Sequence, residues 1–246
     1  MIEVTDLKVG YDNDVILKNL NFSVMKGEIF VILGGSGSGK STLLKHMIGL
    51  YKPITGDIVI HGQSIVNTST SAKRDLMKTF GVLYQSGALF ASLTLEENIT
   101  LVLEEHTALP PKERKRIALE KLTLVGLEDY GAYYPAAISG GMKKRAGLAR
   151  AMALSPDLLF FDEPSAGLDP ISSADLDKLL IKLAREHNTT LVVVTHELDS
   201  IYTIADRAIM LDSETQSIIA EGKPQELKEN STNKWVQKFL TRDGLY

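Results

Sequence analysis

The sequence contains no cysteine and no apolar run long enough to cross a bilayer. Without cysteine the chain has no disulfide bond and no thiolate metal site, which suits a reducing cytosol. The longest apolar runs, at residues 158–161 and 191–194, fall far short of the ~18 residues that a membrane-spanning helix requires. Strand-like residues begin the chain directly, so we expect no signal peptide. Any function at a membrane would therefore depend on a partner protein.

The chain also lacks an excess of positive charge. Its 27 lysine and arginine residues are outnumbered by 31 aspartate and glutamate residues, which gives a net charge of −4. Because a nucleic-acid-binding protein ordinarily carries a basic excess or a basic patch, we expect no nucleic-acid partner. The 246 residues, 44% of them hydrophobic, are enough for one large α/β domain or for a core with an inserted subdomain.

A glycine-rich segment stands between a strand pattern and a helix pattern. Residues 34–41 match G-x-x-x-x-G-K-[ST], after an apolar run at 29–33 and before apolar residues at helical spacing. Glycine lets the backbone bring its N–H groups around a polyphosphate, and the next helix adds its positive N-terminal end. We therefore predict a nucleotide site at Gly34, Gly35, Ser36, Gly37, Ser38, Gly39, Lys40, Ser41 and Thr42.

Individual residues of this site have predicted roles. Lys40 would neutralise oxygens of the β- and γ-phosphates, and the Ser41 hydroxyl would bind Mg²⁺. Tyr11, in a break at residues 10–14, could stack on an adenine ring. Packing of this tyrosine on its own sheet is an equal alternative.

The remaining patterns predict an α/β fold. Residues 2–24 contain short strand runs, among them 15–17 and 20–24, and residues 54–66 read as a hairpin, so we expect a small antiparallel sheet. Further apolar runs alternate with helical segments, which indicates a parallel sheet with polar groups at the carboxyl ends of its strands. These runs are 80–84, 158–161 and 191–194.

Helical, charged sequence interrupts this pattern. We interpret residues 86–138, including helical segments at 92–103, 110–125 and 127–135, as an inserted helical subdomain. The nucleotide-binding core then comprises residues 1–85 and 139–246 of a single domain. A short amphipathic helix that carries Trp235 and Phe239 is expected to pack on its own domain.

Polar residues follow the buried strands at the points where chemistry is expected. Two adjacent carboxylates at the end of a buried strand are costly unless they hold a cation or take part in a reaction. Asp162 is placed to hold Mg²⁺, and Glu163 to polarise a water for attack on the γ-phosphate. Gln85 could bind the same metal, and His196 could hydrogen-bond the γ-phosphate. Taken singly, Gln85 and His196 would more often be structural residues.

Together, these residues resemble the ATPase subunits of ATP-binding-cassette (ABC) transporters along the whole chain. Tyr11 matches the aromatic loop, residues 34–41 the Walker A loop, and Gln85 the Q-loop. The signature sequence matches residues 138–142, Walker B matches 158–163, the D-loop matches 165–169 with Asp169, and the switch histidine matches His196. The resemblance implies a P-loop NTPase core of RecA type, with an antiparallel β subdomain and a helical subdomain, that hydrolyses ATP with Mg²⁺.

The resemblance also implies an assembly. Two copies would form a head-to-tail homodimer that sandwiches two ATP molecules, each between Lys40 of one copy and the signature of the other. The signature residues acting in trans would be Ser139, Gly140, Gly141 and Met142. Hydrolysis at Glu163 would let the two copies separate. The helical subdomain, linked through Gln85, would pass this motion through residues 86–98 to an integral membrane permease at the cytoplasmic face of the inner membrane.

Two residues depart from the common ABC pattern, and the second narrows the resemblance to a subfamily. Gly35 replaces a bulkier residue, and Met142 replaces the usual glutamine. With residues 85–90, 105–110 and 139–146, the chain resembles the Mla/Mce-type phospholipid-transport ATPases. That family implies a membrane-anchored Mce-type lipid-carrying protein and, in some systems, a STAS-domain regulator. The alternatives are transport of polar amino acids, a soluble cassette ATPase acting on DNA or ribosomes, and a regulatory subunit that binds nucleotide without hydrolysing it.

Overall fold

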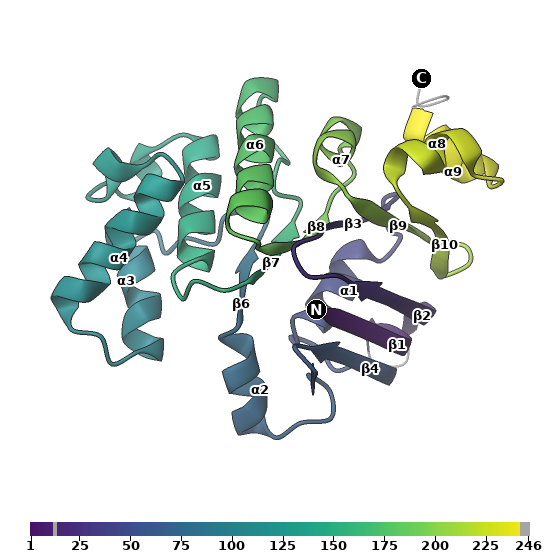
Figure 1. Cartoon of the computed structure of the whole chain (residues 1–246), viewed down its shortest axis with the longest axis horizontal. Helices are drawn as coiled ribbons and strands as arrows, with labels where there is room; N and C mark the ends of the chain where they lie inside the picture. The colour runs from purple at the N-terminus through teal and green to yellow at the C-terminus, as the bar shows by residue number, and fades with distance from the viewer. Residues whose placement is uncertain (12–13, 242–246) are drawn as a thin grey trace.

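The computed structural model describes residues 1–11 and 14–241. Asp12 and Asn13, in the predicted break at 10–14, lie outside the described residues. Within the described part of the chain, the strands form a six-stranded sheet and a four-stranded sheet (Figure 1). A helix lies between the two sheets, and further helices cover the outer face of the larger sheet. This arrangement confirms the predicted α/β class.

The larger sheet has the order β10-β9-β3-β8-β7-β6. Its strands run parallel except β10, which pairs antiparallel with β9. The carboxyl ends of β3, β7 and β8 therefore meet at one edge, as the sequence predicts. The bounds are β3 Ile29–Gly34, β6 Phe80–Leu83, β7 Leu158–Asp162, β8 Thr190–Val194, β9 Arg207–Asp212 and β10 Ser217–Gly222.

The smaller sheet is antiparallel, in the order β2-β1-β4-β5. The predicted runs at 15–17 and 20–24 form one continuous strand. Asn19, between them, takes a left-handed backbone conformation (φ 53°) at an irregularity in the pairing, and the strand continues past it. The hairpin predicted at 54–66 is confirmed by β4 and β5. The bounds are β1 Ile2–Tyr11, β2 Asp14–Val24, β4 Thr55–Ile60 and β5 Gln63–Ser64.

The central strand β3 divides the hydrophobic core in two. Its side chains alternate between faces, so Phe30 and Ile32 pack with the small sheet and α1 (Lys40–Met47). Ile29, Val31 and Leu33 join the opposite core, with side chains of helices that follow β6 in the chain. All six residues of β3 are buried. The strand that leads into the glycine-rich loop is thus held on both faces.

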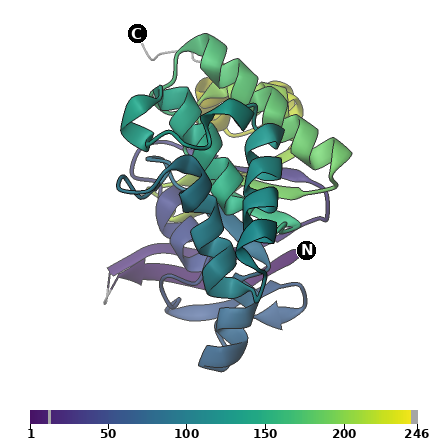
Figure 2. The same cartoon turned by 90° about the vertical axis from the view of Figure 1, so that its left-hand side faces the viewer.

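Helices α3, α4 and α5 form the part of the molecule at the left of Figure 1, and Figure 2 shows α3 and α4 side by side. Their bounds are α3 Leu95–His106, α4 Pro111–Leu124 and α5 Gly140–Ala151, and α2 (Thr70–Met77) precedes β6. The helix expected over 127–135 is absent among these described residues. Gly131 and Pro135 interrupt it, leaving short 3₁₀ turns at Glu128–Tyr130 and Pro135–Ala137.

Four helices follow β7 in the described chain, the first beside α5 and the last two at the end of the sheet near β9 and β10 (Figure 1). They are α6 Pro170–Glu186, α7 Leu198–Ile204, α8 Pro224–Asn230 and α9 Lys234–Thr241. Helix α9 packs on the domain, as predicted: Val236 and Leu240 are buried, and the Tyr202 hydroxyl donates a hydrogen bond to the Leu240 carbonyl at 2.7 Å. No helix in the described ranges is long and apolar enough to span a membrane.

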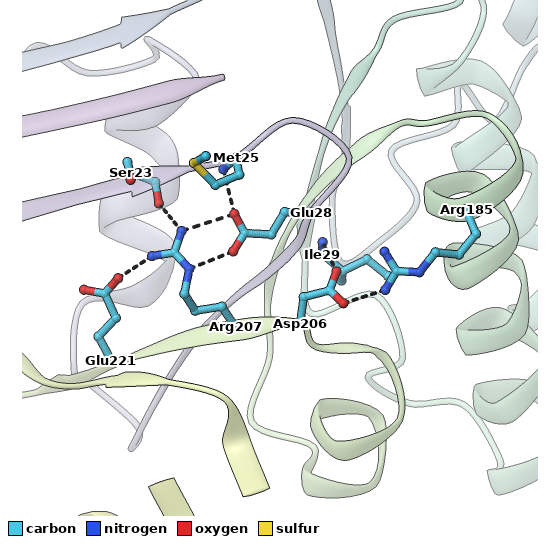
Figure 3. A network of polar contacts seen from close by, with 8 residues as sticks. All are labelled: Ser23, Met25, Glu28, Ile29, Arg185, Asp206, Arg207 and Glu221. Atoms are coloured by element: carbon cyan, nitrogen blue, oxygen red, sulfur yellow. Dashed lines mark hydrogen bonds and ion pairs between the residues drawn. The ribbon is translucent and has the colours of Figure 1, made fainter. Parts of the chain in front are cut away.

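Arg207 links the two sheets through a polar network (Figure 3). Its guanidinium donates to both oxygens of Glu28, at 2.8 and 3.1 Å, to the Ser23 carbonyl at 2.6 Å, and to Glu221. These hydrogen bonds, first of all those to Glu28, raise the Arg207 pKa. Because Glu28 immediately precedes β3 and also accepts a hydrogen bond from the Met25 amide, the network fixes where β3 begins.

Candidate nucleotide-hydrolysis site

A cavity of about 880 Å³ opens at the carboxyl edge of the large sheet. It brings the glycine-rich loop together with three polar residues that the sequence singles out. It also includes side chains of β2 and α9, which the sequence did not assign to the site. The lining comprises residues 34–42, Gln85, Glu163, His196, Ile16, Trp235, Lys238 and Phe239.

The glycine-rich loop has the strand–loop–helix form that its sequence predicts. Gly37 and Gly39 have positive φ angles of 77° and 91°, which glycine adopts without the strain that other residues incur. Helix α1 begins at Lys40, and the apolar residues at 43, 44, 47 and 48 are buried beneath it. The loop therefore presents its amides and a helix N-terminus to the cavity.

Lys40 holds the start of this loop. Its ammonium donates to the carbonyls of Gly34 and Gly35 at 2.9 and 3.0 Å. Burial lowers the Lys40 pKa, while the negative charges of Glu163 and Asp162 oppose that shift. The cation thus lies within the electrostatic field of both carboxylates.

Ser41 and Asp162 come together as a pair of oxygen donors. The Ser41 hydroxyl donates to Oδ1 of Asp162 at 3.0 Å, and burial raises the pKa of that carboxyl. A hydroxyl and a carboxylate are hard ligands that suit Mg²⁺, and a cation here would offset the cost of burying the negative charge. Among the described residues no group of three or more His, Asp or Glu side chains could hold a metal by itself. The donor set fits an Mg²⁺ ion that is completed by substrate phosphate and water.

Glu163 occupies a strained backbone conformation at the end of β7. Its φ is 48°, and its amide donates to the Val194 carbonyl at 2.8 Å. Oε1 lies 2.8 Å from Nδ1 of His196, while Oε2 is buried with no hydrogen-bond partner among the described residues. A buried carboxylate oxygen without a partner can accept a proton from a water, so the geometry suits a general base.

Gln85 and Tyr11 differ in how they relate to the cavity. Gln85, two residues after β6, is exposed and lines it. Tyr11 is not part of the lining. Its hydroxyl lies 3.4 Å from the Thr42 hydroxyl, and its ring packs edge-on against Tyr51 at a centroid distance of 5.0 Å. Stacking of Tyr11 on a base stays a prediction.

The signature residues lie outside the cavity formed by the described chain. Ser139 caps α5, because its hydroxyl accepts a hydrogen bond from the Met142 amide at 3.2 Å. Gly140 is exposed at the start of that helix. Asp169 of the D-loop likewise caps α6, accepting from the amides of Ile171 and Ser172 at 3.0 Å. Within the described chain Ser139 and Asp169 act as helix caps, and their role toward a second copy stays a prediction.

Comparison with known proteins identifies the family. The profile of the ABC transporter family matches residues 17–166. The chain belongs to the ABC transporter family. This ABC protein is 41% identical to the intermembrane phospholipid transport system ATP-binding protein MlaF of Haemophilus influenzae, over 96% of this chain and 89% of the relative. It is 39% identical to a probable ribonucleotide transport ATP-binding protein, mkl, of Mycobacterium tuberculosis, over 97% of this chain and 66% of the relative.

Solved ABC structures share the fold. A dimeric post-hydrolysis state of the ATP-binding cassette MJ0796, bound to ADP and Pi, matches with a TM-score of 0.82 at 31% identity, covering 91% of this chain and 98% of that one. The cbiO1 protein of Clostridium perfringens, part of the ABC transporter complex cbiONQ, matches with a TM-score of 0.84 at 27% identity, covering 98% and 92%. The P-loop NTPase fold and the ATPase activity predicted from sequence are thereby confirmed.

Sequence reasoning missed several residues at this ABC site. Lys144 of α5 is buried, and its ammonium donates to the Glu163 carbonyl at 3.3 Å. Burial lowers the Lys144 pKa, with Glu163 the strongest opposing charge. Because other basic residues surround Lys144 after the signature, the sequence did not single it out. The sequence showed the α9 residues only as one face of an amphipathic helix. Their contact with the glycine-rich loop could not be predicted, because most of the sequence separates the loop from this helix.

Proposed function

We propose that this chain is the ATP-hydrolysing subunit of a phospholipid transporter, working at the cytoplasmic face of the inner membrane with a separate permease. The observation that carries the proposal is the 41% identity to MlaF of Haemophilus influenzae over 96% of this chain. A second similarity, 38% identity with MlaF of Escherichia coli, extends over 100% of the chain and supports the same cargo.

In the proposed reaction, the loop amides and Lys40 bind the β- and γ-phosphates of ATP. Ser41, Asp162 and Gln85 would hold Mg²⁺, which supplies charge neutralisation of the phosphates. Glu163 orients a water and accepts its proton as the water oxygen bonds to the γ-phosphorus. The bond between that phosphorus and the bridging oxygen breaks, which leaves ADP and phosphate. His196 holds the Glu163 carboxylate by its 2.8 Å contact and faces the γ-phosphate.

The signature and D-loop residues enter this reaction through a homodimer. Ser139, Gly140, Gly141 and Met142 would face the γ-phosphate held by the other copy, with Asp169 beside them. Their position at a helix N-terminus outside their own cavity supports this role, because such an end attracts anions. The dimeric form of the similar cassette MJ0796 supports it as well.

Residues 86–138 are proposed to carry the nucleotide-driven motion to the membrane. In this proposal, residues 86–98 dock on the permease. A membrane-anchored Mce-type lipid-carrying protein would complete the transporter, with a STAS-domain protein as a candidate regulator. Helix α5 supports this mechanical link, because it packs on α3 and α4 as well as on β6 of the core.

Purification of the tagged chain from its own membranes tests the cargo class. We expect a permease to co-purify with bound phospholipid, and we expect phospholipid vesicles containing the complex to show ATP-dependent lipid movement. A complex carrying the Glu163→Gln substitution is the matched control and should move no lipid. Transport of ribonucleotides or polar amino acids by the same vesicles, without lipid movement, would overturn the phospholipid assignment. Recovery with ribosomes or DNA in place of a permease would overturn transport.

A further inference from the structure

Helix α9 forms one wall of the nucleotide cavity. Trp235, Lys238 and Phe239 all line it, because positions i, i+3 and i+4 share a face of a helix. Val236 and Leu240 on another face are buried in the core. Together with the Tyr202 hydrogen bond to the Leu240 carbonyl, this packing anchors α9, so the cavity face of the helix is set by the core beneath it.

The contact of α9 with the glycine-rich loop identifies which end of the nucleotide it faces. The indole Cζ2 of Trp235 lies 3.6 Å from the position that a Cβ on Gly35 would occupy. The Gly35 carbonyl also accepts a hydrogen bond from Lys40, the residue that binds the β- and γ-phosphates in loops of this pattern. Tyr11, the candidate base-stacking residue, lies beside Thr42 at the other end of the loop. Trp235 is therefore at the terminal-phosphate end.

The charges of the lining favour an anion at this end. Two lysines, Lys40 and Lys238, line the cavity together with one acidic residue, Glu163, and the imidazole of His196. The hydroxyl and amide groups around them carry no charge. Lys238 adds a second positive charge to the lining, and the Trp235 indole offers an N–H donor and an apolar surface that excludes water. A terminal phosphate matches this combination of groups.

We propose that Trp235 and Lys238 contact the γ-phosphate of bound ATP, so that α9 makes the site favour ATP over ADP. The proposal rests on the nucleotide site described above and adds to it a wall supplied by the C-terminal helix. ADP, which lacks the terminal phosphate, would not reach these two side chains.

Isothermal titration of the magnesium complexes of AMP-PNP and ADP tests this discrimination. Lys238→Gln should weaken AMP-PNP binding by about three- to tenfold and change ADP binding by less than about twofold, because one charge-assisted contact is lost. Lys234→Gln makes the same chemical change on the same helix, outside the cavity lining, and is the matched control. Equal affinities for the two variants, or equal weakening of both nucleotides, would overturn the proposal.

Trp235 gives an independent readout, because it is the single tryptophan of the chain. At a protein concentration where sedimentation shows monomers, saturating AMP-PNP should shift or quench its fluorescence more than saturating ADP does. Trp235→Phe should raise the KM for ATP about threefold with kcat nearly unchanged, since it removes binding without removing the base. Identical spectra with both nucleotides would contradict the contact. Failure of the unaltered protein to bind any nucleotide would instead refute the site as a whole.

Discussion

Glu163 shows how one residue can be held ready for chemistry at a cost in stability. Its left-handed backbone conformation costs on the order of 1 kcal/mol, since a side chain with a Cβ is disfavoured there. That conformation is kept by the hydrogen bond from the Glu163 amide to the Val194 carbonyl and by the hydrogen bond from the Lys144 ammonium to the Glu163 carbonyl. His196 engages one carboxylate oxygen, which leaves the other for a water.

Replacing Glu163 with glutamine should abolish turnover while it preserves nucleotide binding. The amide keeps the size of the carboxylate but cannot accept the proton, so we expect phosphate release to fall by about 10²–10⁴-fold. Steady-state phosphate release and titration with AMP-PNP measure the two effects separately. Glu229→Gln, on the exposed surface of α8, is the control and should match the unaltered protein. Hydrolysis that persists undiminished in Glu163→Gln would show that another group is the base.

Replacing Lys40 with alanine should remove most of the nucleotide affinity. The substitution deletes a charged partner of the phosphates and also frees the carbonyls of Gly34 and Gly35. We expect affinity for ATP to fall on the order of 10- to 100-fold. Lys52→Ala, at an exposed position beyond α1, is the matched change and should leave affinity intact. Unchanged binding by Lys40→Ala would refute the assignment of the phosphate loop.

At the scale of elements, α5 packs closely against β6 because each of the two elements has a glycine at the contact. A side chain on Gly81 would overlap the Ala151 carbonyl at the end of α5. A Cβ on Gly147 would lie 2.7 Å from the Gly87 carbonyl oxygen and 2.8 Å from Cδ1 of Leu83. The helix that begins with the signature residues therefore packs directly against the strand that leads to Gln85.

Gly147→Ala should disrupt this close packing of α5 against β6. Because the neighbouring atoms belong partly to backbone, they cannot simply rotate away, and we expect the free energy of unfolding to fall by about 1–3 kcal/mol. Urea denaturation followed by circular dichroism measures the change. Gly131→Ala is the control, since a Cβ there would meet its nearest neighbours at ordinary contact distances of 3.4 and 3.8 Å. A Gly147→Ala protein as stable as the control would contradict the close packing.

A buried carboxyl between α6 and α7 should make stability depend on pH. Asp177 accepts a hydrogen bond from the Ser200 hydroxyl at 2.9 Å, and burial raises the Asp177 pKa in the folded protein. The protonated form therefore stabilises the fold fully below the unfolded-state pKa of about 3.9, and this contribution is lost as pH rises through the folded-state pKa. Asparagine has no such proton to lose.

Asp177→Asn should accordingly raise the free energy of unfolding at pH 7, and its advantage over the unaltered protein should shrink toward pH 4. Urea unfolding at a series of pH values measures the difference. Asp175→Asn, on the exposed side of the same helix, should show little change at any pH. A pH-independent difference between Asp177→Asn and the unaltered protein would show that this carboxyl does not titrate as proposed.

The elements predictable from sequence are those whose signal is local. The apolar runs that became β3, β7 and β8 are fully buried strands, and polar residues follow them at the expected edge. The continuity of β2 through Asn19 depends on a left-handed backbone conformation that the residue type did not reveal, whereas Gly131 and Pro135, which interrupt the helix expected over 127–135, are visible in the sequence. The approach of α9 to Gly35 joins segments 200 positions apart, so it depends on tertiary packing. The composition of the site was therefore largely predictable, but not its C-terminal wall.

At the scale of the whole molecule, nucleotide hydrolysis in the proposed homodimer should control assembly. ATP would join Lys40 of one copy to Ser139 of the other, and hydrolysis would remove the joining charge. Glu163→Gln with Mg²⁺ and ATP should therefore elute as a dimer in size-exclusion chromatography, and the same protein without nucleotide should elute as a monomer. The double variant Lys40→Ala/Glu163→Gln is the control and should stay monomeric with ATP. A monomer in every condition would contradict the sandwich.

The hydrogen bonds from Lys40 to the carbonyls of Gly34 and Gly35 tie the side chain proposed to meet the phosphates to the backbone of its own loop. Because these bonds already restrict the lysine rotamer and the loop backbone, little conformational entropy is left to lose when a phosphate binds. Association should then proceed at the pace of ordinary docking encounters, and variants of the loop should differ chiefly in how long ATP remains resident.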